Sequence, residues 1–289
     1  MTTTHTLDTD GASIVYDVHG PLPTADGRPP LFMIGQPMPA GGFATLASLF
    51  SDRTVITYDP RGLGRSTRRD GRVDNSPTVQ AEDVHAVIEA LGAGPVEMFG
   101  SSGGAVTGLA LVAAYPNDVT TLVAHEPPLI TLLPDAEAAE RARALVRDVY
   151  EAKGSNAGFA AFIAGGSWQG EYTDAFFAQA TPDPAQFGMP DTDDGSRDDP
   201  LLSDRSWPVS GYRPDVAALA AAPTRILIAV GEESTGVLTG RTSEATAALL
   251  GRRTTVFPSH HGGFMGPESG YPGQPEAFAR RLREVLDAT

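Results

Sequence analysis

The feature that most constrains this chain is the segment Gly100-Ser101-Ser102-Gly103-Gly104, which joins a short apolar run to a helix pattern rich in small residues. Residues 96–99 predict a strand and residues 105–114 predict the helix. Glycine stands two positions before and two positions after Ser102, where neighbouring backbone approaches too closely for a Cβ atom. We therefore predict Ser102 as a nucleophile raised above the carboxyl edge of a sheet. Ser101 is the competing candidate, but only Ser102 has glycine at both of these positions.

The backbone amide of Gly103 is the second chemical feature of this turn. Gly103 follows Ser102 directly and stands at the start of the predicted helix. The N-terminus of a helix favours negative charge, because the peptide dipoles align along the helix axis. An oxyanion formed by attack of Ser102 on a carbonyl would lie close to this amide, so we predict Gly103 as one donor of an oxyanion hole.

Strand and helix patterns alternate along most of the chain. Short apolar runs without polar alternation indicate a mostly parallel sheet with helices on both faces. Ligands bind beyond the carboxyl ends of the strands in such sheets, which directs attention to Gln36, Ser102 and Glu126. The expected strands are 12–18, 31–34, 54–58, 96–99, 121–124, 225–231 and 254–257, and the expected helices outside the cap are 43–50, 77–91, 105–114, 242–250 and 275–286.

The alternation stops between residues 129 and 213, where helix patterns follow one another without strands. We predict that residues 1–128 and 214–289 form the core domain, and that residues 129–213 form a helical cap inserted into it. Large apolar side chains are concentrated in this cap, which indicates the roof of an apolar pocket. The predicted substrate-binding residues are Met38, Phe162, Trp168, Trp207 and Phe264.

Composition narrows the classes of partner. The 289-residue chain has a formal net charge of -15, and Lys153 is its only lysine, which argues against nucleic acids and anionic membranes. The absence of cysteine excludes disulfides, thiolate metal ligands and a thiol nucleophile. No signal peptide and no apolar run of the roughly 20 residues that span a bilayer is visible. We expect a cytoplasmic protein without metal or other cofactor that binds a hydrophobic small molecule; a homodimer is compatible with the sequence.

A serine nucleophile needs a base, and the chain has only 6 histidines. His5 belongs to a loose N-terminus, and His125 neighbours Glu126, so its side chain should point to the opposite face of the strand. The remaining strong candidates follow the last predicted strand. We favour His261, because the small residues after it let the imidazole reach over the sheet edge; His260 is the alternative.

The chain resembles the α/β-hydrolase superfamily over nearly its whole length. The resemblance rests on Ile34-Gly35-Gln36-Pro37, on the segment from Tyr58 to Ser66, on the turn at Ser102 and on His261. It implies an eight-stranded, mostly parallel sheet with helices on both faces and an inserted cap. It also implies that the Gln36 amide completes the oxyanion hole beside Gly103. Ile34 replaces the histidine that the family usually carries before this residue.

The resemblance implies that the base is oriented by an acid, and the position of this acid departs from the usual family pattern. The family commonly has Asp in the turn after the strand that follows the cap, where this chain has Ser234. Some members, zearalenone lactonases among them, place the acid one strand earlier, where Glu126 precedes two prolines. We therefore favour Glu126 as the acid, with Glu232 and Glu233 as alternatives.

These residues together predict a cofactor-independent serine hydrolase that cleaves an ester or lactone of a hydrophobic small molecule through an acyl-enzyme on Ser102. A hydrolase of carbon–carbon bonds or a perhydrolase would use the same triad and is the alternative within enzymes. Epoxide hydrolases and haloalkane dehalogenases use an Asp nucleophile, so Ser102 argues against them. A ligand-binding protein without catalytic activity is the alternative from another class.

Overall fold

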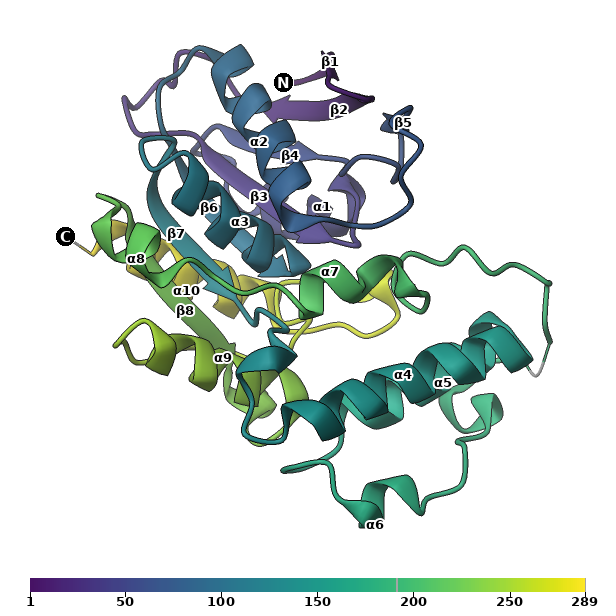
Figure 1. Ribbon diagram of the computed structural model, residues 1–289. Helices are drawn as coiled ribbons and strands as arrows, with labels where there is room; N and C mark the ends of the chain where they lie inside the picture. Colours follow the sequence, from purple (N-terminus) through teal and green to yellow (C-terminus); the bar gives the residue numbers. More distant parts are fainter. Residues whose placement is uncertain (191, 289) are drawn as a thin grey trace.

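The computed structural model describes residues 1–190 and 192–288, which contain a nine-stranded sheet (Figure 1). Its order is β1-β2-β4-β3-β6-β7-β8-β9, and the short β5 pairs with β2. From β4 to β9 all neighbours are parallel, whereas β2 is antiparallel to β1 and β4. The strands are β1 (Thr2–Thr9), β2 (Ala12–His19), β3 (Leu31–Gln36), β4 (Val55–Tyr58), β5 (Thr67–Arg68), β6 (Val96–Ser102), β7 (Val119–His125), β8 (Arg225–Gly231) and β9 (Thr255–Phe257).

Strand β1 corrects the expected loose N-terminus. It pairs with β2 along its whole length, from Thr2 opposite His19 to Thr9 opposite Ala12. Most of its side chains are polar and exposed, because β1 lies at the edge of the sheet. An edge strand that contributes little to the core lacks the apolar pattern by which buried strands are predicted, and its backbone pairing with β2 defines it instead.

Helices cover both faces of the sheet, as the alternating pattern predicts. Side chains of successive residues point to opposite faces of a strand, so Ile34 and Met33 of β3 belong to two different apolar clusters. One cluster joins the sheet to α2 (Pro77–Leu91), α3 (Gly103–Ala114), α8 (Val216–Ala221) and α9 (Leu238–Leu249), and the other joins it to α1 (Ala44–Ser48) and α10 (Pro275–Asp287).

The segment between β7 and α8 forms a group of helices beside the core, at lower right in Figure 1. The two longest of these helices pack against each other. Val209 of the last one packs into the core cluster near α3, so this end of the segment is anchored to the sheet layer. The helices are α4 (Ala136–Lys153), α5 (Ser155–Gly166), α6 (Asp174–Phe177) and α7 (Trp207–Ser210), with single 3-10 turns at Ile130–Leu132, Pro184–Phe187 and Asp204–Ser206.

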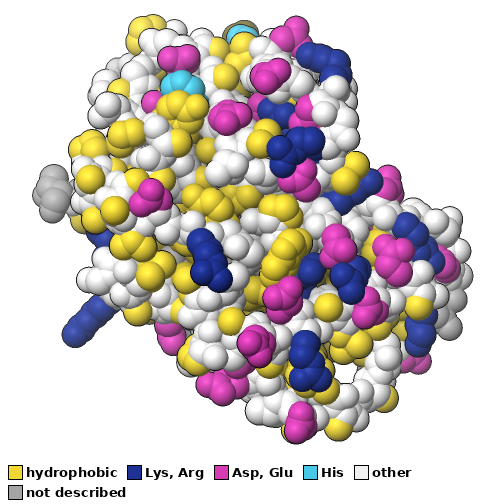
Figure 2. Space-filling model, in the orientation of Figure 1, with side chains coloured by type: hydrophobic (Ala, Val, Ile, Leu, Met, Phe, Trp, Pro, Cys, Tyr) yellow, Lys and Arg dark blue, Asp and Glu magenta, His cyan; other side chains and the backbone are white. Residues whose placement is uncertain are grey.

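The surface of the molecule differs between the cap and the line where the cap meets the core. Figure 2 shows hydrophobic side chains gathered along this line and charged side chains of both signs spread over the cap. Within residues 1–190 and 192–288, no helix has the combination of length and apolar character that crossing a bilayer requires. The hydrophobic side chains along the line between cap and core indicate that a ligand site should be sought in the space between these two parts.

Candidate active site

The turn at Ser102 has strained backbone and no spare room. Ser102 ends β6, α3 begins at the next residue, and its φ of 56° and ψ of -125° are rarely adopted by residues other than glycine. A Cβ atom on Gly100 would lie 2.7 Å from the Gly104 carbonyl oxygen, and one on Gly104 would lie 2.4 Å from the Ile34 carbonyl oxygen. Both glycines are therefore required by close backbone contacts, which hold Ser102 at the edge of the sheet.

Glu126 follows the last residue of β7 and is fully buried. Its Oε2 atom lies 2.6 Å from Nδ1 of His261, and its Oε1 accepts a hydrogen bond of 2.8 Å from the backbone N–H of Gly231. Burial opposes ionisation of this carboxyl, but the hydrogen bond and charge of His261 outweigh it, so the pKa of Glu126 lies below its usual range. The buried carboxylate is thus paired and its orientation is fixed by two donors.

Ser234 supports this carboxylate from the end of β8. Its side chain is 2% exposed. Its Oγ and the Oε1 of Glu126 lie 3.1 and 3.2 Å from the position that a Cβ atom on Gly231 would take. The nearby Ser234 hydroxyl also favours the ionised form of Glu126 and so lowers its pKa. The residue that stands where the family commonly has Asp therefore contacts the acid of β7.

The two ring nitrogens of His261 differ, because Nδ1 is hydrogen-bonded to Glu126 and Nε2 can accept a proton. Because Nδ1 faces the Glu126 carboxylate, the neutral imidazole carries its proton there and leaves Nε2 as an acceptor. Its side chain is 42% exposed and lies in the wall of a cavity that also contains Ser102. Among the described residues no hydrogen bond joins Ser102 to His261; catalytic hydrogen bonds often tighten only when substrate binds.

The cavity that contains these residues has a volume of about 470 Å³ and lies between the core and the cap. Most of its wall is apolar, including Ile130, Val146 and Leu202. Residues of β3, β6, the first position of α3, the cap and the loop after β9 meet there. A space of this size suits a small organic molecule.

Gln36 and Gly103 both lie in the cavity wall beside Ser102. Gln36 ends β3 and stands opposite Ser102 in the parallel pairing of β3 with β6. A Cβ atom on Gly103 would lie 2.7 Å from the Gln36 carbonyl oxygen, so the two backbones are in close contact. The side-chain amide of Gln36 is buried without a hydrogen-bond partner.

A comparison with known protein families identifies the family of this chain. The α/β hydrolase fold family model matches residues 37–184. The chain belongs to the α/β-hydrolase family. Its sheet and flanking helices confirm the fold expected from the sequence.

Two curated relatives of this α/β-hydrolase match part of its length. An uncharacterized hydrolase, YraK of Bacillus subtilis, is 34% identical over 129 residues, which cover 44% of this chain and 46% of the relative. A putative carbamate hydrolase, RutD of Caulobacter segnis, is 34% identical over 122 residues, which cover 42% and 44%. The chain thus spans less than half the length of these curated relatives.

Solved structures match the whole chain at low sequence identity. An α/β hydrolase from Sphaerobacter thermophilus has a TM-score of 0.63 and 21% identity, covering 98% of this chain and 100% of its own. A thermophilic esterase from Thermogutta terrifontis, solved with malate bound, has a TM-score of 0.61 and 21% identity, covering 98% of each chain. At this identity the similarity establishes the fold.

Four of the predicted substrate-binding residues lie outside the cavity wall, whereas Phe162 lines it. Phe264 is 2% exposed and stacks on Phe43 in the core. Met38 packs against the backbone of Gly35 and Gly42. Trp168 and Trp207 pack with the apolar cluster of the cap. These four side chains are mostly large and apolar, and such side chains suit core packing as well as the wall of a pocket.

The alternative base and acids have other contacts. His260 accepts a hydrogen bond from the Gly262 N–H at 3.0 Å, and its ring lies against Tyr271. Glu232 accepts one from the Ser259 N–H at 3.2 Å. Glu233 is exposed at the cavity edge. Of these side chains and Glu126, it is Glu126 that is hydrogen-bonded to His261.

Ser101 and His125 form a buried pair beside the site, and the centre of the His125 ring lies 6.0 Å from that of His261. Ser101 Oγ lies 3.2 Å from His125 Nδ1, and both residues are at most 2% exposed. Burial lowers the pKa of His125 to about 4, and its Nε2 has no hydrogen-bond partner. The imidazole is therefore neutral near pH 7. Four phenylalanine rings surround it, namely Phe99, Phe257, Phe264 and Phe278.

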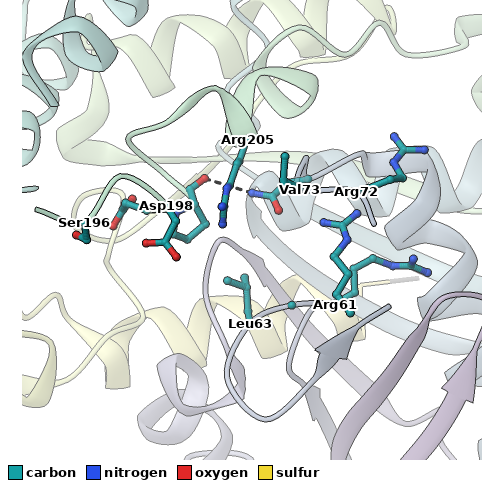
Figure 3. Close-up of a pocket in the computed structure, with 12 residues that line it drawn as sticks. Arg61, Leu63, Arg72, Val73, Ser196, Asp198 and Arg205 are labelled. Carbon is teal, nitrogen blue, oxygen red and sulfur yellow. Dashed lines mark hydrogen bonds between the residues drawn. The ribbon is translucent and has the colours of Figure 1, made fainter. Parts of the chain in front are cut away.

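A second cavity of about 490 Å³ lies between the loop after β4 and the cap segment before α7 (Figure 3). Arg61 in its wall contacts Asp83 at 2.7 Å and Asp70 at 2.8 Å. Asn75 lines both cavities, and its backbone N–H donates to the Arg205 carbonyl oxygen at 2.8 Å. Ser102 and His261 line the other cavity, so we place the candidate active site there.

Sequence reasoning missed several polar residues of the cavity that contains Ser102, among them Asn75, Arg143 and Tyr271. Each lies in a segment without a catalytic motif, so nothing in the local sequence marks them. Arg143 belongs to the amphipathic helix α4, where an arginine is ordinarily expected on a solvated face. Within the described ranges, no three His, Asp, Glu or Cys side chains are grouped as ligands for a metal ion.

Proposed function

We propose that this chain is a cofactor-independent serine hydrolase that cleaves an ester or lactone of a hydrophobic small molecule through an acyl-enzyme on Ser102. The observation that carries the proposal is the 2.6 Å contact between fully buried Glu126 and His261, in a cavity wall shared with Ser102. A buried ion pair is weak evidence for added stability. Perturbed carboxylates beside a cavity are typical of catalytic sites.

In the first half of the proposed reaction, Ser102 Oγ attacks the carbonyl carbon of the substrate. Its proton passes to Nε2 of His261, whose Nδ1–H remains bound to Glu126. The tetrahedral intermediate then collapses, the carbon–oxygen bond to the alcohol breaks, and His261 returns the proton to the departing alkoxide. For a lactone the alcohol remains attached to the same acyl chain.

In the second half, water attacks the acyl carbon and gives one proton to His261. Collapse of the second intermediate releases the carboxylic acid, and the proton on His261 restores the Ser102 hydroxyl. The reaction consumes one water per ester and requires no oxidant or reductant. Burial of Glu126 keeps its charge close to the imidazolium that forms in both halves.

The oxyanion of both intermediates would accept hydrogen bonds from the backbone amides of Gln36 and Gly103. Both residues lie in the cavity wall beside Ser102, and their backbones are in contact. Removing one donor of such a pair typically costs about 100- to 1,000-fold in kcat. The apolar wall of the cavity supports a hydrophobic substrate.

The test is labelling with a fluorophosphonate, which reacts only with an activated serine, followed by peptide mapping. We expect the label on Ser102, none on Ser102→Ala, and normal labelling of the matched control Ser101→Ala. Hydrolysis of 4-nitrophenyl esters should follow the same order. A wild-type protein that is folded, turns over no ester and remains unlabelled at Ser102 would contradict the proposal and favour a ligand-binding role.

A further inference from the structure

One charged side chain stands out in the wall of the active-site cavity. Helix α4 contributes Ala139, Ala142, Arg143 and Val146 to this wall. This spacing places the four on one face of the helix, so Arg143 lies among apolar neighbours on the side of α4 that faces the cavity. Its side chain is only 20% exposed.

The charge of Arg143 is incompletely balanced by the protein. Among the described residues its acidic contact is Asp204, which is 3.4 Å away, is 61% exposed, and is shared with Arg147 at 3.3 Å. The Nε atom of Arg143 is buried without a hydrogen-bond partner. Its guanidinium also lies 4.4 Å from the centre of the Trp207 ring. A half-buried guanidinium with long, shared contacts retains capacity for another anion.

Electrostatics within the cavity are consistent with this capacity. Burial lowers the pKa of Arg143 and Asp204 opposes that effect, but the group stays protonated at neutral pH. The acidic side chain of the cavity wall is Glu233, which is exposed to solvent at the end of β8. Solvent weakens the electrostatic interactions of the exposed Glu233 carboxylate. The half-buried position of Arg143 strengthens the electrostatic interactions of its guanidinium.

We propose that Arg143 binds a carboxylate on the substrate, so that the preferred ester or lactone carries an apolar chain that ends in an anionic group. This inference rests on the proposed hydrolase function and specifies the substrate class of the same cavity. The carboxylate accepts hydrogen bonds from the guanidinium, while the apolar wall packs along the chain between this group and the carbonyl at Ser102. This ion pair balances the charge of the Arg143 guanidinium and orients the reacting carbonyl of the substrate.

The experiment compares two series of 4-nitrophenyl esters that differ only in the end group of the acyl chain. The anionic probes are the 4-nitrophenyl half-esters of dicarboxylic acids from succinate to suberate, and the neutral probes are 4-nitrophenyl alkanoates of the same chain lengths. Initial rates give kcat/KM for the wild type, Arg143→Gln, Arg143→Lys and Arg147→Leu. Arg147 is the matched control, because it also contacts Asp204 but does not line the cavity.

We expect the wild type to favour the anionic ester at one chain length. Arg143→Gln should reduce this preference about 10- to 100-fold, as loss of a hydrogen bond to a charged group implies. Arg143→Lys should retain part of the preference, and Arg147→Leu should retain all of it. An equal loss for both esters in Arg143→Gln, or a wild type without preference at any length, would overturn the inference and leave the hydrolase function standing.

A binding measurement separates this inference from the hydrolase proposal. Calorimetric titration with the free dicarboxylate of the best chain length, or with adipate if neither ester is cleaved, does not depend on turnover. Binding to the wild type that is at least tenfold weaker in Arg143→Gln and unchanged in Arg147→Leu would support the carboxylate site. Equal binding to wild type and Arg143→Gln, or no binding, would overturn it.

Discussion

The ends of the neighbouring strands β7 and β8 differ in what their side chains do. Glu126 follows β7, is fully buried and is hydrogen-bonded to His261. The turn after β8 contains two carboxylates, Glu232 and Glu233, but both are exposed, and its buried side chain is Ser234. The comparison teaches that burial and direction, and not the number of carboxylates, decide which strand end supplies the hydrogen-bond partner of His261.

The backbone makes this difference between the strand ends possible. Ser102, Glu126 and Ser259 are the non-glycine residues with positive φ in the described part of the chain, at 56°, 50° and 70°. All three lie at or just beyond the ends of strands that border the site. Such conformations are unfavourable and persist where surrounding structure imposes them. The strain at Glu126 turns its carboxylate toward His261.

The largest predicted effect tests the comparison directly. Glu126→Gln should lower kcat about 10,000-fold, because the amide cannot stabilise the imidazolium and favours the wrong tautomer of His261. The matched variant Glu232→Gln should stay within about twofold of the wild type, since an exposed charge contributes little. Steady-state kinetics with a 4-nitrophenyl ester measure both. The reverse order would place the acid at the end of β8.

A transfer of the acid between the two strand ends should give the next largest effect. In Glu126→Ser the further change Ser234→Asp is expected to restore about tenfold or more in kcat, because the Ser234 side chain already contacts the position of the Glu126 carboxylate. Circular dichroism establishes that both variants are folded. A folded double variant no faster than Glu126→Ser would show that only β7 can present the acid.

Removing the support of Glu126 should have a smaller effect. Ser234→Ala removes a hydroxyl that favours the charged form of Glu126, and an interaction of a hydroxyl with a charged group typically contributes about 1.5 kcal/mol or more. We expect kcat to fall about tenfold and the acidic limb of the pH–rate profile to move to higher pH, because the pKa of Glu126 rises when this hydroxyl is removed. Loss of stability with an unchanged pH profile would indicate a purely structural role for Ser234.

The last prediction concerns stability instead of turnover, and the residue before Glu126. The pKa of His125 is lowered from 6.5 to about 4, so between these values the unfolded chain binds a proton that the folded chain does not. Stability therefore falls as pH decreases through this window. Glu126, whose pKa is also lowered, contributes stability above its unfolded pKa that is lost as pH falls through its folded pKa.

We expect His125→Phe to reduce the loss of unfolding free energy between pH 6.5 and pH 4 by about 3 kcal/mol. Urea denaturation at several pH values measures it, with values above pH 7 as the internal reference. An unchanged slope in a folded variant would show that burial of His125 is not the cause of this acid sensitivity.

Much of the fold could be predicted because its signals are local. The apolar runs of β3, β4, β6, β7 and β8 belong to strands covered on both faces, and these runs predict the parallel sheet. Strand β1 is different, since it is exposed and held by backbone pairing with β2. Its side chains therefore carry no periodic signal that distinguishes it from a loop.

The sequence by itself determined the turn at Ser102, because the glycines required by its close backbone contacts stand within two residues of it. It also limited the candidates for base and acid to a few side chains after strands. Only the tertiary structure showed which of these side chains meet, since His261 and Glu126 are 135 residues apart and a hydrogen bond depends on direction as well as proximity. The same holds for Arg143, which is an ordinary helical arginine until the cap folds over Ser102 and turns one face of α4 toward the cavity.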